Sequence, residues 1–385
     1  MSTPDALLIA LPAGAGSRVS PATPVAGLPL LRRIALAARR GGFSAVRVAG
    51  FATEDAAVLA GTSAASLAPD ALPHPLPRRL VVVGGATVPQ AAWLARLREM
   101  PVEPEHVHVD GDGAVAVIET QDPARVLAAL AEAPSMPEAM TRLAPMLKVV
   151  TGSLPPGGHV VVRDRGDLAR AESWLLQSLI KPSEGFMSRH FERRISLALT
   201  RRLARTAITP NAMTLISLCV GFTGAALFLV PSLQLPAALL FLAHSILDGC
   251  DGELARLKFM ESPRGAALDF WGDNLVHAAV FTCMAVGWSL AAGSAWPLAV
   301  GAAAVLSTAI VAVAAYRRDL IARAPDEDAA TSSRVVEALA HRDFIYLIVA
   351  LAAVGKAYWF IPVTAVGAPA FLALLLWSVR RTHSA

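Results

Sequence analysis

The stretch Leu247–Asp273, LDGCDGELARLKFMESPRGAALDFWGD, places four aspartates in the most apolar half of the chain. Ionisable side chains are costly at membrane depth, so their presence in such a segment indicates a functional site. Asp248 and Asp251 are three residues apart, and Asp269 and Asp273 are four apart. Because residues at these spacings share one face of an α-helix, the stretch predicts two helices with paired carboxylates.

The turn between the two predicted helices is short and carries Pro263 and Gly265, which makes the helices antiparallel neighbours. Four converging carboxylates would repel one another, and a divalent cation relieves that repulsion. An all-oxygen ligand set suits Mg²⁺ or Mn²⁺. Gly252 leaves room for a close backbone approach by a substrate, and Arg256 can bind a phosphate. The stretch therefore predicts a metal site beside a phosphate-binding site.

The composition is that of a chain that lies partly in a membrane. Its 385 residues are 55% hydrophobic and 17% charged, with a mean hydropathy of +0.51. Apolar stretches of about 20 residues can each cross the bilayer as a helix. The sequence predicts six, at roughly 210–230, 234–257, 265–291, 295–316, 343–360 and 361–379.

Basic residues gather on one side of these predicted spans. They precede the first span, follow the second, fourth and last, and are rare in the other loops. By the positive-inside rule, both termini and the aspartate stretch face the cytoplasm of an inner-membrane protein. No aromatic and basic residues alternate as in a nucleic-acid binder, and the three cysteines have neither metal-site nor disulfide spacing. The N-terminus lacks the basic region of a signal peptide.

Residues 181–207 connect the two halves of the chain. They include SRHFERRISLALTRRLART, Ser188–Thr206, a basic stretch with apolar residues at helical spacing. This pattern predicts an amphipathic helix along the membrane surface. The alternative is a solvated linker.

Residues 1–180 alternate short apolar runs with helical patterns, which predicts a three-layer α/β domain. The predicted strands are Ala6–Ala13, Ala45–Gly50, Leu80–Gly84, His106–Val109, Ala114–Glu119 and His159–Val162. The predicted helices are Leu30–Arg40, Pro89–Met100, Ala124–Ala133 and Leu168–Leu179. We therefore expect this α/β domain, the juxtamembrane helix of 181–207 and an all-α six-helix membrane domain over 208–385.

The aspartate stretch resembles the signature of the CDP-alcohol phosphotransferases (CDP-alcohol phosphatidyltransferases). Eight positions match: Asp248, Asp251, Gly252, Ala255, Arg256, Gly265, Asp269 and Asp273. The resemblance covers about 205–380, including TPNAMT (Thr209–Thr214), which is similar to the family's opening of the first span. A metal-dependent transfer of a phosphoalcohol group to a hydroxyl acceptor, with release of CMP, is what this resemblance implies.

The resemblance also implies roles for individual residues. Two Mg²⁺ or Mn²⁺ ions would be held by Asp248, Asp251, Asp269 and Asp273, and Asp273 would be the general base. The CDP part of the donor would contact Asp248, Gly252, Ala255, Arg256, Asn211 and Thr214. Arg317, Arg318 and Arg342 lie near the same predicted membrane face, where they either bind an acceptor phosphate or act as positive-inside anchors. The resemblance further implies a donor that is CDP-inositol-like or CDP-diacylglycerol, an acceptor that is an alcohol or a lipid, and a homodimeric protein.

The N-terminal domain resembles GT-A-like nucleotidyltransferases. The resemblance rests on the segment LPAGAGSR and the downstream segment VAGLPLL. In the first segment, Gly14, Gly16, Ser17 and Arg18 match a loop whose N–H groups cradle a nucleotide. Ser20 and Gly85 depart from the family, which has a lysine and a metal-binding acid in those regions. Asp110, Asp112 or Asp164 are the alternatives for the acid. A degenerate domain is therefore favoured over an active one.

The order of the two domains resembles archaeal bifunctional enzymes that make CDP-inositol and then a di-inositol phosphodiester. Two alternatives to an enzyme with transferase activity alone stay open. One is a bifunctional enzyme that also makes its CDP-alcohol from CTP. The other is a transporter or binding protein that uses the aspartates as an ion path, although their position at helix ends and the motif's Gly252, Ala255 and Arg256 favour the transferase.

Overall fold

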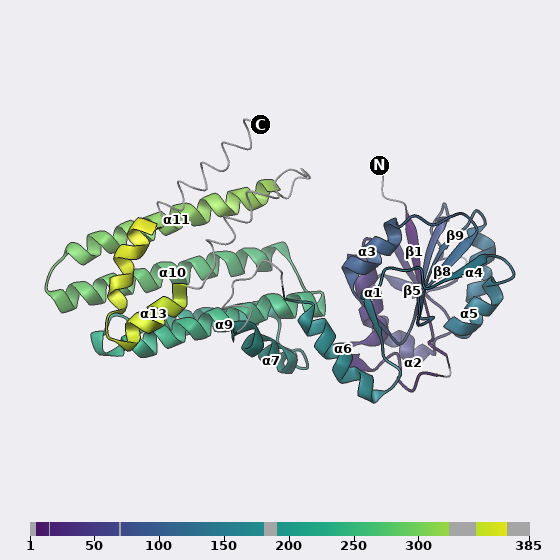
Figure 1. Ribbon diagram of the computed structural model, residues 1–385, viewed down its shortest axis with the longest axis horizontal. Helices are drawn as coiled ribbons and strands as arrows, with labels where there is room; N and C mark the ends of the chain where they lie inside the picture. Colours follow the sequence, from purple (N-terminus) through teal and green to yellow (C-terminus); the bar gives the residue numbers. More distant parts are fainter. Residues whose placement is uncertain (1–4, 15, 69–70, 181–190, 323–343, 368–385) are drawn as a thin grey trace. The chain divides into compact units, whose positions relative to one another are not determined.

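The computed structural model describes residues 5–14, 16–68, 71–180, 191–322 and 344–367 (Figure 1). The chain divides into two compact units, Met1–Gln177 and Ser178–Ala385. The first unit is a mixed α/β domain and the second is helical.

Unit 1 is built on a seven-stranded sheet with the strand order β10-β8-β9-β6-β1-β4-β5. The strands are β1 (Ala6–Leu11), β4 (Ala45–Val48), β5 (Ala64–Ser66), β6 (Arg79–Gly84), β8 (His106–Val109), β9 (Val115–Glu119) and β10 (Lys148–Thr151). All neighbours are parallel except β9, which is antiparallel to both β6 and β8. The central strands β1 and β6 are buried along their whole length, which explains their continuous apolar sequences.

Helices cover both faces of this sheet, as the predicted three layers require (Figure 1). On one face lie α1 (Leu30–Arg40) and α3 (Ala91–Glu99), and on the other α4 (Pro123–Ala131) and α5 (Met136–Leu143). The described residues of the unit also form α2 (Thr53–Ala56), the 3₁₀ helix η1 (Ala57–Leu59) and α6 (Arg165–Gln177). The α4–α5 face buries a core in which Ile9 and Ile118 of the sheet join Leu127 and Leu143 of the helices.

Most elements predicted for unit 1 occur, and the differences have local causes. The predicted strand at His159–Val162 is β11 (His159–Val161), which pairs with β7 (Thr87–Pro89) in a separate two-stranded sheet. A second small sheet joins β2 (Pro24–Val25) and β3 (Leu28–Pro29). Strand β10 was not predicted, because this edge strand is mostly exposed and shows no alternation of apolar and polar residues.

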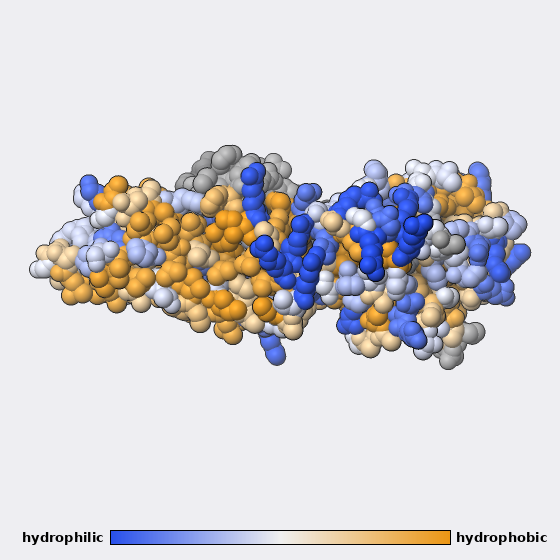
Figure 2. All heavy atoms as spheres, turned by 90° about the horizontal axis from the view of Figure 1, so that it is seen from below, coloured by the Kyte–Doolittle hydropathy of each residue, from blue (hydrophilic) through white to orange (hydrophobic). Residues whose placement is uncertain are grey.

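The described residues of unit 2 contain four helices that are long and apolar enough to cross a membrane, at Pro210–Leu227, Pro231–Lys258, Pro263–Ala292 and Trp296–Arg317. They correspond to α8 (Pro210–Leu227), α9 (Gln234–Lys258), α10 (Pro263–Ala292) and α11 (Trp296–Ala322). Among the described residues, every large hydrophobic side chain that is exposed, except Val149, lies in this unit. The face of this unit that Figure 2 shows is accordingly largely apolar. The chain is therefore an integral membrane protein.

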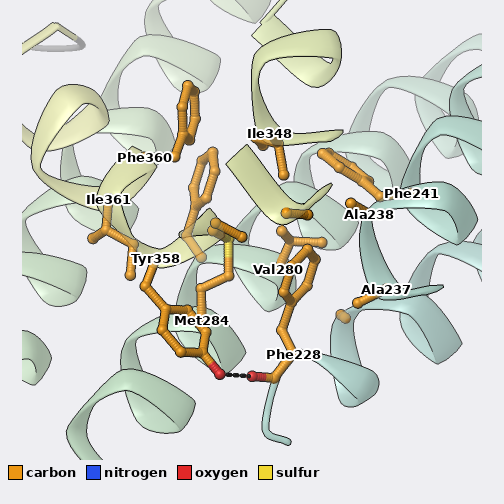
Figure 3. Packing of buried hydrophobic residues seen from close by; sticks show 14 of the residues in the cluster. Phe228, Ala237, Ala238, Phe241, Val280, Met284, Ile348, Tyr358, Phe360 and Ile361 are labelled. Atoms are coloured by element: carbon orange, nitrogen blue, oxygen red, sulfur yellow. Dashed lines mark hydrogen bonds between the residues drawn. The ribbon is translucent and has the colours of Figure 1, made fainter. Parts of the chain in front are cut away.

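The core of unit 2 lies between α8, α9, α10, α11 and residues 344–361 (Figure 3). Phe228, Phe241 and Met284 are buried there, and the Tyr358 hydroxyl donates to the backbone oxygen of Phe228 over 2.9 Å. Gly224 permits close packing of α8 and α9, because an added Cβ would lie 3.0 Å from Leu240.

The last two predicted spans differ from the structure or lie partly outside the described residues. In place of one helix over 343–360, α13 (Phe344–Ala353) is followed by Gly355 at φ 70° and by η6 (Ala357–Trp359). Glycine adopts this left-handed conformation readily, and the helix ends there. The sixth predicted span, 361–379, is described only to residue 367.

Candidate active site

Three of the four motif aspartates lie together at the end of the α9–α10 hairpin. Asp248 and Asp251 are buried on α9, and each offers a carboxylate oxygen within 4.8 Å of the others and of one from the half-buried Asp269 on α10. The Thr214 hydroxyl, on α8, donates to Asp251 Oδ2. Three carboxylates at this spacing, two of them buried, can hold a divalent metal ion, and their hard oxygen atoms fit Mg²⁺ or Mn²⁺.

The two helix starts near this group are defined by capping residues. Thr209 accepts a hydrogen bond from the Ala212 N–H at the start of α8, and Ser262 accepts one from the Gly265 N–H at the start of α10. Proline stands at the first position of both helices, where its missing N–H is not needed. The predicted turn between α9 and α10 therefore forms, and it places Asp251 opposite Asp269.

The fourth aspartate, Asp273, lies outside the three-carboxylate group. Asp273 Oδ1 is 3.3 Å from His244 Nε2, and Asp273 Oδ2 is 3.9 Å from His277 Nδ1. His244 Nδ1 lies 3.0 Å from the backbone oxygen of Ser217. Because four residues on a helix span about 6 Å, Asp273 stands one turn beyond Asp269.

A pocket of about 200 Å³ opens beside the three-carboxylate group. It contains every residue predicted to bind the CDP part of the donor except Asp248. Its lining comprises Pro210, Asn211, Thr214, Asp251, Gly252, Ala255, Arg256, Met260, Glu261, Ser262, Gly265, Ala266 and Asp269. The first turns of α8 and α10 both contribute, and helix N-termini favour anionic groups.

Two glycines keep space in this pocket. A Cβ at Gly252 would lie 3.3 Å from the Arg256 guanidinium, and one at Gly265 would lie 3.0 Å from Asn211 Oδ1. Both distances are tighter than ordinary contacts. The glycines therefore let Arg256 and Asn211 keep their positions on the pocket wall.

The predicted acceptor cations are described only in part. Arg317 is exposed near the end of α11. The side chain of Arg318 and the whole of Arg342 lie outside the described residues.

The predicted nucleotide loop of unit 1 lies beside a separate pocket of about 360 Å³. Gly14 has φ 91° and its oxygen accepts from the Ser17 N–H, while the Arg18 N–H donates to the oxygen of Arg163. Gly14 and Ser17 line the pocket, whereas Gly16 and Arg18 are exposed and do not. Among the described residues that line this pocket, Glu138 is the charged one.

The two positions at which unit 1 departs from nucleotidyltransferases have structural partners of other kinds. The Ser20 hydroxyl donates to Asp55 Oδ1 over 3.1 Å. Gly85 lies under an aromatic ring, since an added Cβ would come 2.9 Å from Phe51. A carboxylate in place of Gly85 would require Phe51 to move.

The alternative acids of unit 1 are engaged in turns and ion pairs. Asp110 Oδ1 accepts from the N–H groups of Ala114 and Val115, and Asp110 Oδ2 is 2.9 Å from His159 Nε2. Burial acts to raise the pKa of Asp110, but these hydrogen bonds outweigh burial and lower it. Asp112 pairs with Arg163 over 2.8 Å.

Asp164 caps the start of α6 by accepting from the Gly166 N–H. Asp110, Asp112 and His159 have ligand atoms within 4.8 Å of one another. Asp110, Asp112 and Asp164 are not among the described residues that line the pocket beside the loop.

Sequence reasoning missed two groups of residues near the aspartates. His244 precedes Asp248 by one helical turn, so a histidine within an apolar span was the available signal. Glu253, inside the motif, receives hydrogen bonds from Ser196 and Thr200 of α7 (Arg193–Leu203). The signal for these was weaker, because the pattern of 181–207 suggested an apolar buried face.

Comparisons with known proteins find a matching family model, curated relatives and a similar solved structure. Residues 207–379 match the model of the family described as CDP-alcohol phosphatidyltransferase. A "Bifunctional IPC transferase and DIPP synthase" of Rubrobacter xylanophilus is 34% identical over 145 residues, 35% of this chain and 33% of that protein. A CDP-diacylglycerol–serine O-phosphatidyltransferase of Mycobacterium leprae is 32% identical over 98 residues, 23% of this chain and 32% of that protein.

Among solved structures, a phosphatidylinositol phosphate synthase of Mycobacterium tuberculosis with CDP-DAG bound is 18% identical. The match covers 49% of this chain and 92% of the chain of the solved structure, with a TM-score of 0.35. The chain spans about a third of the length of the two curated relatives. Together, the matched family model and the eight-position motif assign the helical unit: residues 207–379 are a CDP-alcohol phosphatidyltransferase domain.

Proposed function

We propose that this protein transfers a phosphoalcohol group from a CDP-alcohol to a hydroxyl acceptor and releases CMP. The observation that carries the proposal is the pocket between α8, α9 and α10, in which Gly252, Ala255 and Arg256 adjoin Asp251 and Asp269. A donor with a pyrophosphate needs both cationic groups and metal ligands, and this pocket offers both.

Binding of the donor follows from the pocket wall. Arg256 can hold one phosphate through its guanidinium, and the N-termini of α8 and α10 add positive electrostatic potential. Mg²⁺ or Mn²⁺ ions, two per site and held by Asp248, Asp251, Asp269 and Asp273, would offset the charge of the pyrophosphate and of the departing CMP. The helix ends and the metal ligands thus act on the same group of the substrate.

The transfer itself requires a base. The acceptor oxygen attacks the phosphorus of the alcohol phosphate, the bond from that phosphorus to the CMP oxygen breaks, and the hydroxyl proton passes to a carboxylate. We assign this role to Asp273, which stands one turn from Asp269 and outside the three-carboxylate group. His244, with Nε2 3.3 Å from one oxygen, positions this carboxylate, and His277 Nδ1 lies 3.9 Å from the other oxygen.

The substrates fall into two classes. A soluble donor such as CDP-inositol would supply a polar head group to a polar or lipid acceptor, in keeping with the Rubrobacter relative. CDP-diacylglycerol would supply a lipid, in keeping with the Mycobacterium leprae relative. Arg317, which is exposed, is proposed to contact an acceptor phosphate together with Arg318 and Arg342. The protein is further proposed to be a homodimer whose termini face the cytoplasm.

The direct test is CMP release by purified full-length protein in detergent. With CDP-inositol or CDP-diacylglycerol and an alcohol acceptor, we expect turnover that stops with EDTA and returns with excess Mg²⁺ or Mn²⁺. Full turnover in EDTA would contradict the metal site. If no donor yields CMP but the reconstituted protein moves ions across vesicle membranes, the transporter alternative holds.

Unit 1 is proposed not to synthesise the CDP-alcohol. Its loop pocket offers no described cation for a triphosphate, and the packing of Phe51 on Gly85 opposes an acid there. Preorganised charge is usually the largest catalytic contribution, so its loss removes the reaction.

This proposal is tested in the full-length Asp251→Asn variant, where transfer is blocked. We expect no pyrophosphate release from CTP with inositol phosphate, glycerol phosphate or sugar phosphates. CTP turnover by this variant, lost on further Arg18→Ala substitution, would establish a bifunctional enzyme.

A further inference from the structure

Glu253 is a fully buried carboxylate inside the aspartate motif, and α7 provides its partners. Arg193 Nη1 donates to Glu253 Oε1 over 2.6 Å, the Ser196 hydroxyl to Oε1 over 2.7 Å, and the Thr200 hydroxyl to Oε2 over 2.6 Å. Both carboxylate oxygens therefore accept hydrogen bonds. Arg193, Ser196 and Thr200 follow one another at three and four residues, so they share one face of α7.

The two helices approach closely at this point. An added Cβ at Gly249, one turn before Glu253, would lie 3.2 Å from the Arg193 guanidinium and 3.8 Å from Ser196 Cβ. Cys250 Sγ is 3.6 Å from the backbone oxygen of Ser196. The contact of α7 with α9 is therefore built from small and polar groups, and not from the apolar face that an amphipathic surface helix would bury.

The predicted metal ligands of α9, Asp248 and Asp251, lie on the other side of this helix. Asp251 and Glu253 are separated by two positions, which is about 200° around an α-helix. Asp251 lines the pocket and accepts a hydrogen bond from the Thr214 hydroxyl of α8. Glu253, on the opposite side of α9, accepts hydrogen bonds from α7. This segment of α9 is thus fixed from two sides.

A buried charge pair adds little to stability compared with apolar packing, but it can define register, because any shift leaves the charge without partners. We propose that Glu253 is a positioning residue: bound by Arg193, Ser196 and Thr200, it fixes the rotation and register of the α9 segment that carries Asp248, Asp251 and Gly252. The inference rests on the proposed function. It gives α7 a part in the reaction in addition to any contact with the membrane surface.

The test is Thr200→Val in the full-length protein, which exchanges a buried hydroxyl for a methyl group of the same size. Mn²⁺ binding, measured by electron paramagnetic resonance without donor, should weaken about tenfold, since a hydrogen bond to a charged group is lost and the carboxylates shift. We expect kcat for CMP release to fall about tenfold while KM for the acceptor stays unchanged. Thr200→Ser should restore both to within about twofold, because it returns the hydroxyl.

Two matched controls accompany this variant. Thr223→Val removes a hydroxyl that donates only to Cys219 of its own helix, and Arg194→Met removes an exposed cation next to Arg193. Both should leave Mn²⁺ binding unchanged, whereas Arg193→Met should weaken it. If Thr200→Val is not recovered as folded protein, Ser196→Ala replaces it, with an expected loss of about threefold because Arg193 still contacts the same oxygen.

Wild-type Mn²⁺ binding and kcat in folded Thr200→Val and Ser196→Ala would overturn the proposal, as would failure of Thr200→Ser to restore them. The outcome is separate from that of the proposed reaction. If the wild-type protein binds Mn²⁺ but releases no CMP, the proposed reaction is contradicted. The effect of Thr200→Val on Mn²⁺ binding still decides the role of Glu253.

Discussion

Asp251→Asn is expected to reduce CMP release by at least about 10²–10³-fold, the loss typical when one preorganised electrostatic group is removed from an active site. Asp251 belongs to the three-carboxylate group, lines the pocket and accepts the Thr214 hydroxyl. An amide is a poor metal ligand, so the variant should also lose most of its Mn²⁺ binding. The protein should still fold, because removing one of three close carboxylates relieves repulsion.

The measurements are CMP release and Mn²⁺ binding on detergent-purified protein that elutes as wild type in size exclusion. Asp122→Asn is a matched control, since Asp122 caps α4 in unit 1 and asparagine caps a helix equally well. Wild-type Mn²⁺ affinity in Asp251→Asn would place the metal elsewhere.

Asp273→Asn is expected to lower kcat by ~10²–10⁴-fold, the range for loss of a general base. The mechanism differs from that of Asp251→Asn, because Asp273 lies outside the three-carboxylate group and contacts His244 and His277. The three carboxylates remain in place, so binding of the CDP-alcohol should persist. An amide cannot accept the acceptor's proton.

Two measurements separate donor binding from the chemical step: the Kd of the donor in the presence of Mg²⁺, and the rate of CMP release in a single turnover. We expect a donor Kd within about threefold of wild type together with slow chemistry, since the pocket wall does not include Asp273. A near wild-type rate would assign the base to another group. Loss of donor binding would show that the donor cannot bind without the metal ligand that Asp273 supplies, and would contradict a role in proton transfer alone.

Much of the fold was predictable from local sequence, because each element is specified by its own periodicity. Helix α1 and strand β8 have the predicted bounds, and the four long helices of unit 2 correspond to the first four predicted spans. Strand β10 and the break at Gly355 were missed. The first is defined by pairing with β8, and the second by a backbone conformation that composition does not specify.

For the candidate site, the spacing of the motif predicted which faces of α9 and α10 carry the aspartates, and the turn at Pro263 predicted that these faces meet. This much follows from helical geometry alone, since residues three or four apart share a face. Distances between helices do not follow from it. Only the tertiary structure separates Asp273 from the other three aspartates and places it between two histidines.

The same distinction explains Glu253, which sits at a position of the motif that the family signature leaves open. Its three partners lie more than 50 residues earlier in the chain, on a helix whose sequence predicted an apolar buried face. Local patterns identify which side of a helix is apolar, but they do not identify which polar groups on two helices will be buried against each other. That choice depends on how closely the backbones approach, here at Gly249, and it is made only when α7 packs on α9.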